Sequence, residues 1–227
     1  AMVAPTSGRV LVRGQDVSEQ DPVALRRSIG YVLQEGGLFP HRTIADNIAT
    51  VPLLEGAPRR QARARALELM DLVGLDRGMA GRYPAQLSGG QRQRVGVARA
   101  LANEADILLM DEPFGALDPL VRADLQAELI RIREQLGTTI LFVTHDIEEA
   151  FRLGDEVVVL KEGGRIAQRG TPERILAEPA DEFVRDFIGS DRADVQLEVR
   201  SVGGRNVVVD PDGRPVGVLG TERREGS

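Results

Sequence analysis

Two continuous apolar segments, with a long amphipathic segment between them, constrain the fold of this chain most strongly. The apolar segments are 106–110 (DILLM) and 138–144 (TTILFVT), and such runs are typical of strands that a parallel sheet buries on both faces. Residues 119–136 between them have helical periodicity and end at Gly137. The apolar side chains of that helix recur at i, i+4, i+7 and i+11, at Leu125, Leu129, Ile132 and Leu136. A strand, a helix and a strand in this order predict an α/β fold with a largely parallel sheet.

Shorter elements flank this unit. Residues 28–33 (SIGYVL) are predicted to form a strand, and residues 58–73 a helix. From Glu156 onward the pattern predicts a hairpin that turns at Gly163–Gly164. Two short helices are expected next, the first with Thr171 as N-cap and Pro172 at its first position, the second ending at Gly189.

The composition changes after Ser190, so we predict two regions, 1–189 and 190–227. The second region is predicted as a small β appendage whose strands surround a Pro-Asp-Gly turn. Its hairpin resembles part of a CBS module, a sensor domain. The alternative is a β appendage that packs on the first region or on a partner.

Composition excludes several classes of protein. No apolar run approaches the roughly 20 residues that a membrane-spanning helix needs, and no signal-peptide pattern opens the chain. The sequence therefore favours a cytoplasmic location. There is no cysteine, so disulfides and cysteine metal sites are excluded. The net charge of −6 argues against a nucleic-acid partner, because a basic surface supplies most of the affinity for nucleic acid.

Two adjacent carboxylates follow the first buried strand. Asp111 and Glu112 come at its carboxyl end, where open α/β sheets bind ligands. Asp111 is a candidate ligand for Mg²⁺, and Glu112 is a candidate base that polarises an attacking water. The alternative is a strand that leads into an ordinary acidic loop.

Polar side chains also follow the other two predicted strands. His145 comes after the second apolar segment and could hydrogen-bond a terminal phosphate. Gln34 follows residues 28–33 and could orient a water or a metal ion. Either residue alone could equally be a loop residue without a role.

The segment 87–95 (LSGGQRQRV) places a serine and two glycines at the start of a predicted helix. The first backbone N–H groups of a helix have no partners within it, and the helix dipole puts partial positive charge there. Ser88, Gly89, Gly90 and Gln91 are therefore predicted to form a cradle for a phosphate.

Taken in order, these motifs resemble those of the nucleotide-binding subunit of an ATP-binding cassette (ABC) transporter over residues 5–189. The resemblance implies a P-loop NTPase-like parallel sheet with a helical subdomain, the helical and signature region covering about 35–137. Gln34 would be the Q-loop glutamine and Ser88–Gln91 part of the signature motif. Asp111 would be the Walker B aspartate, Glu112 the catalytic base, Asp118 the D-loop aspartate and His145 the switch histidine. Gln34 and Asp111 would bind the metal ion. The residues that would bind the nucleotide are Ser88, Gly89, Gly90, Gln91 and Asp118.

Finer segments, such as 83–102 (YPAQLSGGQRQRVGVARALA) and 110–119 (MDEPFGALDP), are similar to importers of glycine betaine, choline or carnitine. This resemblance implies ATP and Mg²⁺ as cofactors and a second ATP-binding subunit in a dimer. It also implies a membrane-spanning permease subunit that docks on residues 34–82, and indirectly a substrate-binding protein. The chain would then lie on the inner face of the cell membrane.

The family holds ATP with a P-loop of the pattern GxxxxGK[ST], whose lysine and N–H groups wrap the phosphates. No segment of the 227 residues matches it, and the single lysine, Lys161, lies on the predicted hairpin. Removing one preorganised donor costs about 3 kcal/mol of transition-state stabilisation, and here several are absent together. We therefore expect the chain as given, without the P-loop strand and helix, to be inactive alone. The sheet should also expose an unpaired edge and uncovered apolar faces, which favours self-association.

Three hypotheses explain the pattern. The chain is an importer ATPase subunit whose P-loop is missing through truncation or a misplaced gene start. Alternatively, it is a non-catalytic partner that contributes its LSGGQ motif to a complete P-loop subunit. A non-transport ABC ATPase of the DNA-repair kind is the third hypothesis, which the acidic charge and the importer-like segments oppose.

Overall fold

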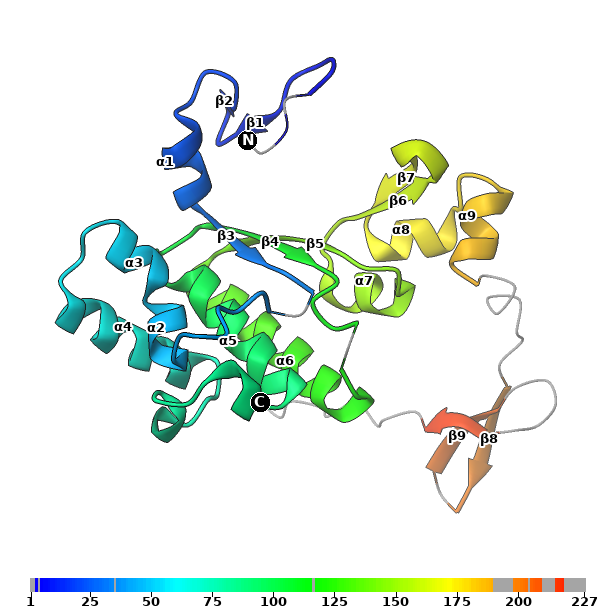
Figure 1. Cartoon of the computed structure of the whole chain (residues 1–227). Helices are drawn as coiled ribbons and strands as arrows, with labels where there is room; N and C mark the ends of the chain where they lie inside the picture. Colours follow the sequence, from blue (N-terminus) through cyan, green and yellow to red (C-terminus); the bar gives the residue numbers. More distant parts are fainter. Residues whose placement is uncertain are drawn as a thin grey trace, which may run out of the picture. The chain divides into compact units, whose positions relative to one another are not determined.

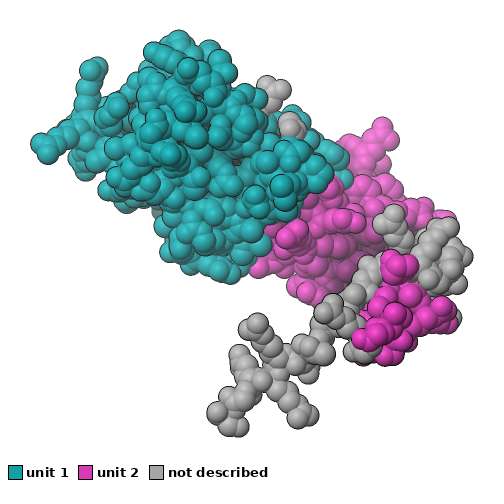
Figure 2. All heavy atoms as spheres, turned by 90° about the horizontal axis from the view of Figure 1, so that it is seen from below, with its two compact units in different colours: residues 1–145 teal, residues 146–227 magenta. Residues whose placement is uncertain are grey.

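The structure, a computed structural model, describes residues 3, 5–34, 36–115, 117–189, 198–203, 205–209 and 215–218. The chain divides into two compact units, residues 1–145 and residues 146–227, which Figure 2 distinguishes by colour. The predicted boundary near Ser190 falls on residues 190–197, outside the described residues, so the division at 190 stays a prediction. The helices that the structure describes are not long and apolar enough to cross a membrane.

A parallel sheet of three strands is the centre of the first unit (Figure 1). The strands are β3 (Ile29–Val32), β4 (Ile107–Asp111) and β5 (Thr139–Val143), in the spatial order β3-β4-β5. The register pairs Gly30 with Leu108, and Leu108 in turn with Ile140. The predicted α/β fold with a parallel sheet is thereby confirmed.

The two faces of this sheet differ in burial. Val32 and Leu108 are fully buried, and α5 (Gly89–Leu101) lies on their side of the sheet (Figure 1). On the other face, Leu141 is 63% exposed and Val143 is 59% exposed. The apolar sequence of β5 predicted burial on both faces, and that prediction was wrong. The open face extends across the sheet to β3, where Tyr31 is 40% exposed, so it is this face, and not the edge position of β5, that exposes Leu141. The exposed apolar surface that we expected is present at this strand.

The remaining helices of the first unit begin and end where local signals place them. The predicted helix α6 (Pro119–Leu136) begins after its N-cap Asp118 and ends at Gly137, whose φ is 64°. Its apolar stripe is buried except at Leu136, which is 46% exposed in the last turn. The other helices are α1 (Pro22–Arg27), α2 (Ile44–Ile48), α3 (Thr50–Leu54), α4 (Arg59–Leu72), η1 (Arg77–Met79) and η2 (Pro84–Gln86).

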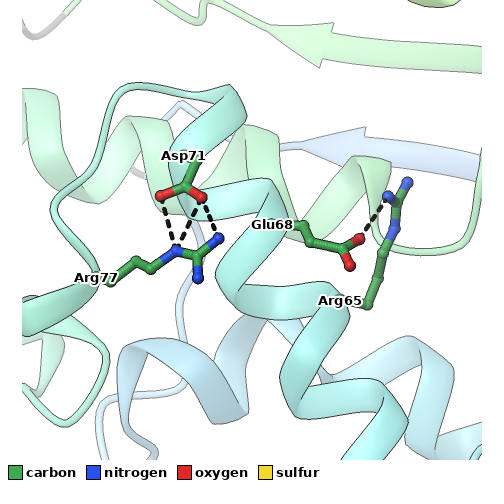
Figure 3. A network of polar contacts seen from close by, with 4 residues as sticks. All are labelled: Arg65, Glu68, Asp71 and Arg77. Atoms are coloured by element: carbon green, nitrogen blue, oxygen red, sulfur yellow. Dashed lines mark hydrogen bonds and ion pairs between the residues drawn. The ribbon is translucent and has the colours of Figure 1, made fainter.

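Two ion pairs lie on α4 and on the turn after it (Figure 3). Arg77 donates from Nε to both carboxylate oxygens of Asp71, at 3.0 and 2.8 Å, and closes the turn that follows the helix. This hydrogen bonding holds the pKa of Asp71 below its ordinary value. One turn earlier, Arg65 Nη1 donates to Glu68 Oε2 at 3.2 Å. Exposed pairs of this kind add little stability but fix the direction of their side chains.

A small antiparallel hairpin precedes the sheet in sequence. Its strands are β1 (Leu11–Val12) and β2 (Gln15–Asp16). Arg13 in the turn donates from Nε to Asp106 Oδ2 at 2.8 Å, just before β4 begins. This ion pair connects the turn of the hairpin with the start of β4.

The second unit has its own apolar core. The predicted hairpin is present as β6 (Val157–Lys161) and β7 (Arg165–Gly170), and Gly163 and Gly164 have φ values of 76° and 72°. The helices are α7 (Ile147–Leu153), η3 (Glu162–Gly164), α8 (Pro172–Ala177) and α9 (Glu182–Phe187). The core consists of Val157, Val159, Ile175, Val184 and Ile188. As predicted, Thr171 caps α8.

The C-terminal strands are antiparallel, in the order β10-β9-β8. They are β8 (Glu198–Val202), β9 (Arg205–Val209) and β10 (Pro215–Val218). The predicted Pro-Asp-Gly turn, at residues 211–213, lies outside the described residues. The likeness to a CBS module also stays a prediction.

Candidate functional site

Three neighbouring parallel strands end at one edge of the sheet, and each is followed by a predicted site residue. Gln34 comes two residues after β3, Glu112 directly after β4 and His145 two residues after β5. Because the carboxyl ends of parallel strands share an edge, side chains far apart in the sequence meet here.

The carboxylate of Glu112 has a predicted site residue on each side. Gln34 Nε2 donates a hydrogen bond to Glu112 Oε2 at 3.0 Å. His145 Nδ1 lies 3.3 Å from Glu112 Oε1, so both oxygens have a neighbour. The Glu112 side chain is 31% exposed and that of His145 is 74% exposed, so the group is open to solvent and to a ligand.

The backbone at Glu112 is strained. Its φ is 41°, in the left-handed region that a residue with a side chain rarely adopts. Its N–H donates to the carbonyl of Val143 at 2.9 Å, so β5 holds it there. A Cβ placed on Gly115 would lie 3.3 Å from Glu112 Oε2, so only a small residue leaves this carboxylate free. Sequence reasoning missed both features; the glycine two residues after Pro113 was the available signal.

Asp111 is the last residue of β4 and is exposed at the same edge. Gln34 uses its Nε2 toward Glu112, which leaves its Oε1 as an available ligand. Among the described residues there is no group of three or more His, Cys, Asp or Glu side chains that could hold a metal ion. One carboxylate and one amide oxygen fit Mg²⁺, which keeps several waters and takes its remaining ligands from a substrate's phosphates.

The predicted phosphate cradle forms the N-terminus of α5, and its side chains are engaged locally. Ser88 is the N-cap: its Oγ accepts from Gln91 N at 3.2 Å, while Gln91 Oε1 accepts from Ser88 N at 3.0 Å. This reciprocal capping box explains why serine and glutamine stand three residues apart. The structure does not bring this turn into hydrogen-bond contact with Glu112 within the described part of the chain.

The structure gives a packing reason for glycine at position 90 but not at position 89. A Cβ on Gly90 would lie 2.4 Å from Val121 Cγ1, so this glycine allows α5 to approach α6. A Cβ on Gly89 would meet Leu117 Cδ2 at 3.7 Å, an ordinary contact. Gly90 is thus required by packing, whereas Gly89 leaves the open side of the turn free.

Asp118 is the N-cap of α6, where its Oδ1 accepts from Val121 N at 3.1 Å.

The loop after Gln34 is held by Asn47 of α2, a fully buried residue that sequence reasoning missed. Asn47 Oδ1 accepts from Phe39 N at 2.7 Å, and its Nδ2 donates to the carbonyl of Thr43 at 2.9 Å. An asparagine among the apolar residues of a short helix was the signal.

Comparison with known proteins agrees with this geometry. A protein-family model described as "ABC transporter" matches residues 1–115. The chain is similar to the glycine betaine/carnitine/choline transport ATP-binding protein OpuCA of Bacillus subtilis (strain 168), with 53% identity over 191 residues, 84% of this chain and 50% of that protein. It is also similar to the osmoprotectant import ATP-binding protein OsmV of Salmonella typhimurium, with 47% identity over 203 residues, 89% of this chain and 53% of that protein. The chain thus spans about half the length of these curated relatives.

Solved structures resemble it as well. CbiO1 of Clostridium perfringens, part of the ABC transporter complex cbiONQ, matches with a TM-score of 0.70 and 30% identity, over 79% of this chain and 72% of that one. The dimeric ATP-binding cassette MJ0796, in a post-hydrolysis state bound to ADP and Pi, matches with a TM-score of 0.66 and 32% identity, over 75% of this chain and 76% of that one. Glutamine, glutamate and histidine converge at one sheet edge, and the LSGGQ segment forms the start of α5. Together with these similarities in sequence and structure, this shows that the chain belongs to the ABC transporter family.

Proposed function

We propose that this chain is part of the ATP-binding, ATP-hydrolysing subunit of an importer for quaternary ammonium osmoprotectants. The observation that carries the proposal is the Glu112 carboxylate, which Gln34 and His145 contact from both sides. The printed names of the relatives, which refer to glycine betaine, carnitine and choline, support the choice of solute class.

In this proposal Glu112 is the general base. One of its oxygens takes the proton of a water that attacks the terminal phosphorus of ATP, and the bond from that phosphorus to the bridging oxygen breaks, so that ADP leaves. The hydrogen bond from Gln34 Nε2 keeps the carboxylate directed. His145, exposed beside it, donates a hydrogen bond to the terminal phosphate. Asp111 and Gln34 Oε1 would hold Mg²⁺, and the ion would neutralise negative charge on the phosphates.

The nucleotide site is shared between two ATP-binding subunits. The turn of Ser88 to Gln91, at the N-terminus of the 13-residue helix α5, faces the γ-phosphate of ATP held on the P-loop of a second subunit. Asp118 lies in the loop beside the same interface. The single lysine, Lys161, is engaged with Asp181 at 2.5 Å on the hairpin of the second unit, so it does not serve as a P-loop lysine.

A permease subunit docks on the surface that residues 34–82 contribute. A groove of about 550 Å³ opens between the end of α3, α4 and the turn that leads into β4. It is lined by Glu55, Gln61, Arg65, Glu68, Asn103 and Glu104 among others. Such a concave, polar surface suits a short helix of a membrane subunit, which would hold the chain on the inner face of the membrane.

Uptake in cells that carry the native gene tests the proposal. Glu112→Gln, introduced into the chromosomal gene, should abolish salt-induced uptake of labelled glycine betaine, choline or carnitine. Glu134→Gln, at an exposed position of α6, is the matched control and should leave uptake unchanged. Normal uptake in the Glu112→Gln strain would refute the assignment of this carboxylate. Unimpaired betaine uptake in a strain without the gene would refute the solute class.

The docking surface has its own test. Ala64→Trp would fill the groove and should prevent co-purification of the permease, while Ala127→Trp, exposed on α6, should not. Equal recovery of the permease with both variants would place the docking surface elsewhere.

Calorimetric titration tests the nucleotide assignment. The chain alone should bind Mg·ATP weakly, and Ser88→Arg should abolish any stimulation that the chain gives to the ATPase activity of a complete P-loop subunit. Micromolar affinity of the chain alone would contradict the shared site.

A further inference from the structure

The loop that follows Gln34 lies directly on the signature helix α5. Gly36 and Gly37 have φ values of 75° and 54°, so the backbone here takes a path that other residues rarely follow. A Cβ on Gly96 of α5 would lie 3.1 Å from Gly36 Cα, and a Cβ on Gly36 would lie 2.9 Å from the carbonyl oxygen of Arg92. Two glycines, one on each side, therefore allow a backbone-to-backbone contact between loop and helix.

Arg99 fixes this contact from the same face of α5. It comes three residues after Gly96, and neighbouring turns place residues three apart on one side of a helix. Its Nη1 donates to the carbonyl of Gly37 at 2.7 Å, and its Nη2 donates to the carbonyl of Gly36 at 2.9 Å. The guanidinium carbon also lies 6.0 Å from the ring centroid of Phe39. A planar fork that binds two successive carbonyls is a geometry that arginine provides and lysine does not.

The loop has a second anchor in α2, where Asn47 binds both the N–H and the carbonyl of Phe39, at 2.7 and 3.1 Å. Asn47 and Arg99 thus hold the loop at Phe39 and at Gly36–Gly37, close to Gln34 in the sequence. Gln34 is the residue that contacts the Glu112 carboxylate.

We infer that Arg99 is a positioning residue: its fork holds the Gly36–Gly37 backbone on α5 and thereby keeps Gln34 within hydrogen-bond reach of Glu112. The role of this positioning in catalysis rests on the proposed function, because it concerns the same base, Glu112.

Hydrogen–deuterium exchange of the purified chain measures the clamp directly. Gly36 N donates to the Leu33 carbonyl at 2.9 Å, so this hydrogen bond protects its amide from exchange. In Arg99→Ala the Gly36 and Phe39 amides should exchange about tenfold faster or more, since hydrogen bonds from a charged donor are lost. Arg99→Lys keeps the charge but not the fork and should still accelerate exchange. It also serves if Arg99→Ala does not fold.

Arg94 gives a matched control on the same helix. Its Nη1 donates to the Val73 carbonyl at 2.7 Å, a contact of the same kind that does not involve the loop. Arg94→Ala should reduce global stability without accelerating exchange at Gly36. Equal acceleration in Arg94→Ala, or none in the Arg99 variants, would overturn the inference.

A second measurement addresses Gln34 itself. Its side-chain amide signal in a ¹H–¹⁵N spectrum is assigned by its loss in Gln34→Glu, and the signal should move in Arg99→Lys and stay in place in Arg94→Ala. An unmoved signal in Arg99→Lys would refute the positioning role. Neither measurement uses ATP hydrolysis or transport, so failure of the proposed function would leave their outcome unaffected.

Discussion

The two glycines of the signature turn allow a prediction with opposite outcomes for one chemical change. Gly→Ala within a helix removes up to about 1 kcal/mol of unfavourable propensity, and this gain is common to positions 89 and 90. At Gly90, however, the new methyl group would lie 2.4 Å from Val121 Cγ1. Overpacking of this kind costs about 1–3 kcal/mol, because a β-branched side chain in a helix has one strongly preferred rotamer.

The difference between the two variants therefore isolates the clash, at about 2 kcal/mol in favour of Gly89→Ala. For a chain of this size each kcal/mol shifts the melting temperature by roughly 2–4 °C, so the variants should melt about 6 °C apart. Thermal unfolding followed by circular dichroism gives the melting temperatures, and urea unfolding gives the free energies independently.

A double variant tests the assigned cause. Val121→Ala removes the methyl group that the new side chain would strike, so the combination of Gly90→Ala with Val121→Ala should recover most of the loss that Gly90→Ala causes. Equal melting of Gly89→Ala and Gly90→Ala, or simple additivity in the double variant, would refute the packing argument for Gly90.

Three further predictions concern other parts of the first unit. Asn47→Ala should cost about 2–4 kcal/mol in urea unfolding, because it leaves the buried polar groups of the loop without partners; a loss below about 1 kcal/mol would contradict this. Leu141→Thr should lower the concentration-dependent mass in light scattering, because Leu141 is 63% exposed on the outer strand; an unchanged mass would place self-association elsewhere. Arg13 lowers the pKa of Asp106 below 3.8, so this pair stabilises above that pH and its contribution is lost as the pH falls through the lower folded pKa. Arg13→Gln should therefore flatten the acid limb of the stability profile, and an unchanged limb would refute the pairing.

Local signals in the sequence were sufficient to predict where several helices begin or end and where the hairpin turns. Asp118 and Gly137 mark both ends of α6, and Thr171 marks the start of α8, because caps act through hydrogen bonds within one turn. The same holds for Gly163–Gly164, where the hairpin needs a positive φ. Apolar runs also identified β4 and β5 as strands of a largely parallel sheet, which led to the expectation that Glu112 and His145 each follow a strand.

Tertiary structure alone decided how these elements act on one another. Glu112 lies 78 residues from Gln34 in the sequence, yet both Gln34 and His145 contact it. These contacts depend on the strand order β3-β4-β5. The exposure of Leu141 depends on which face of the sheet is left uncovered, and the difference between Gly89 and Gly90 depends on where α6 packs against α5. The physical reason is that periodicity and capping are properties of neighbouring residues, whereas steric contact and burial arise only when segments distant in the sequence pack together.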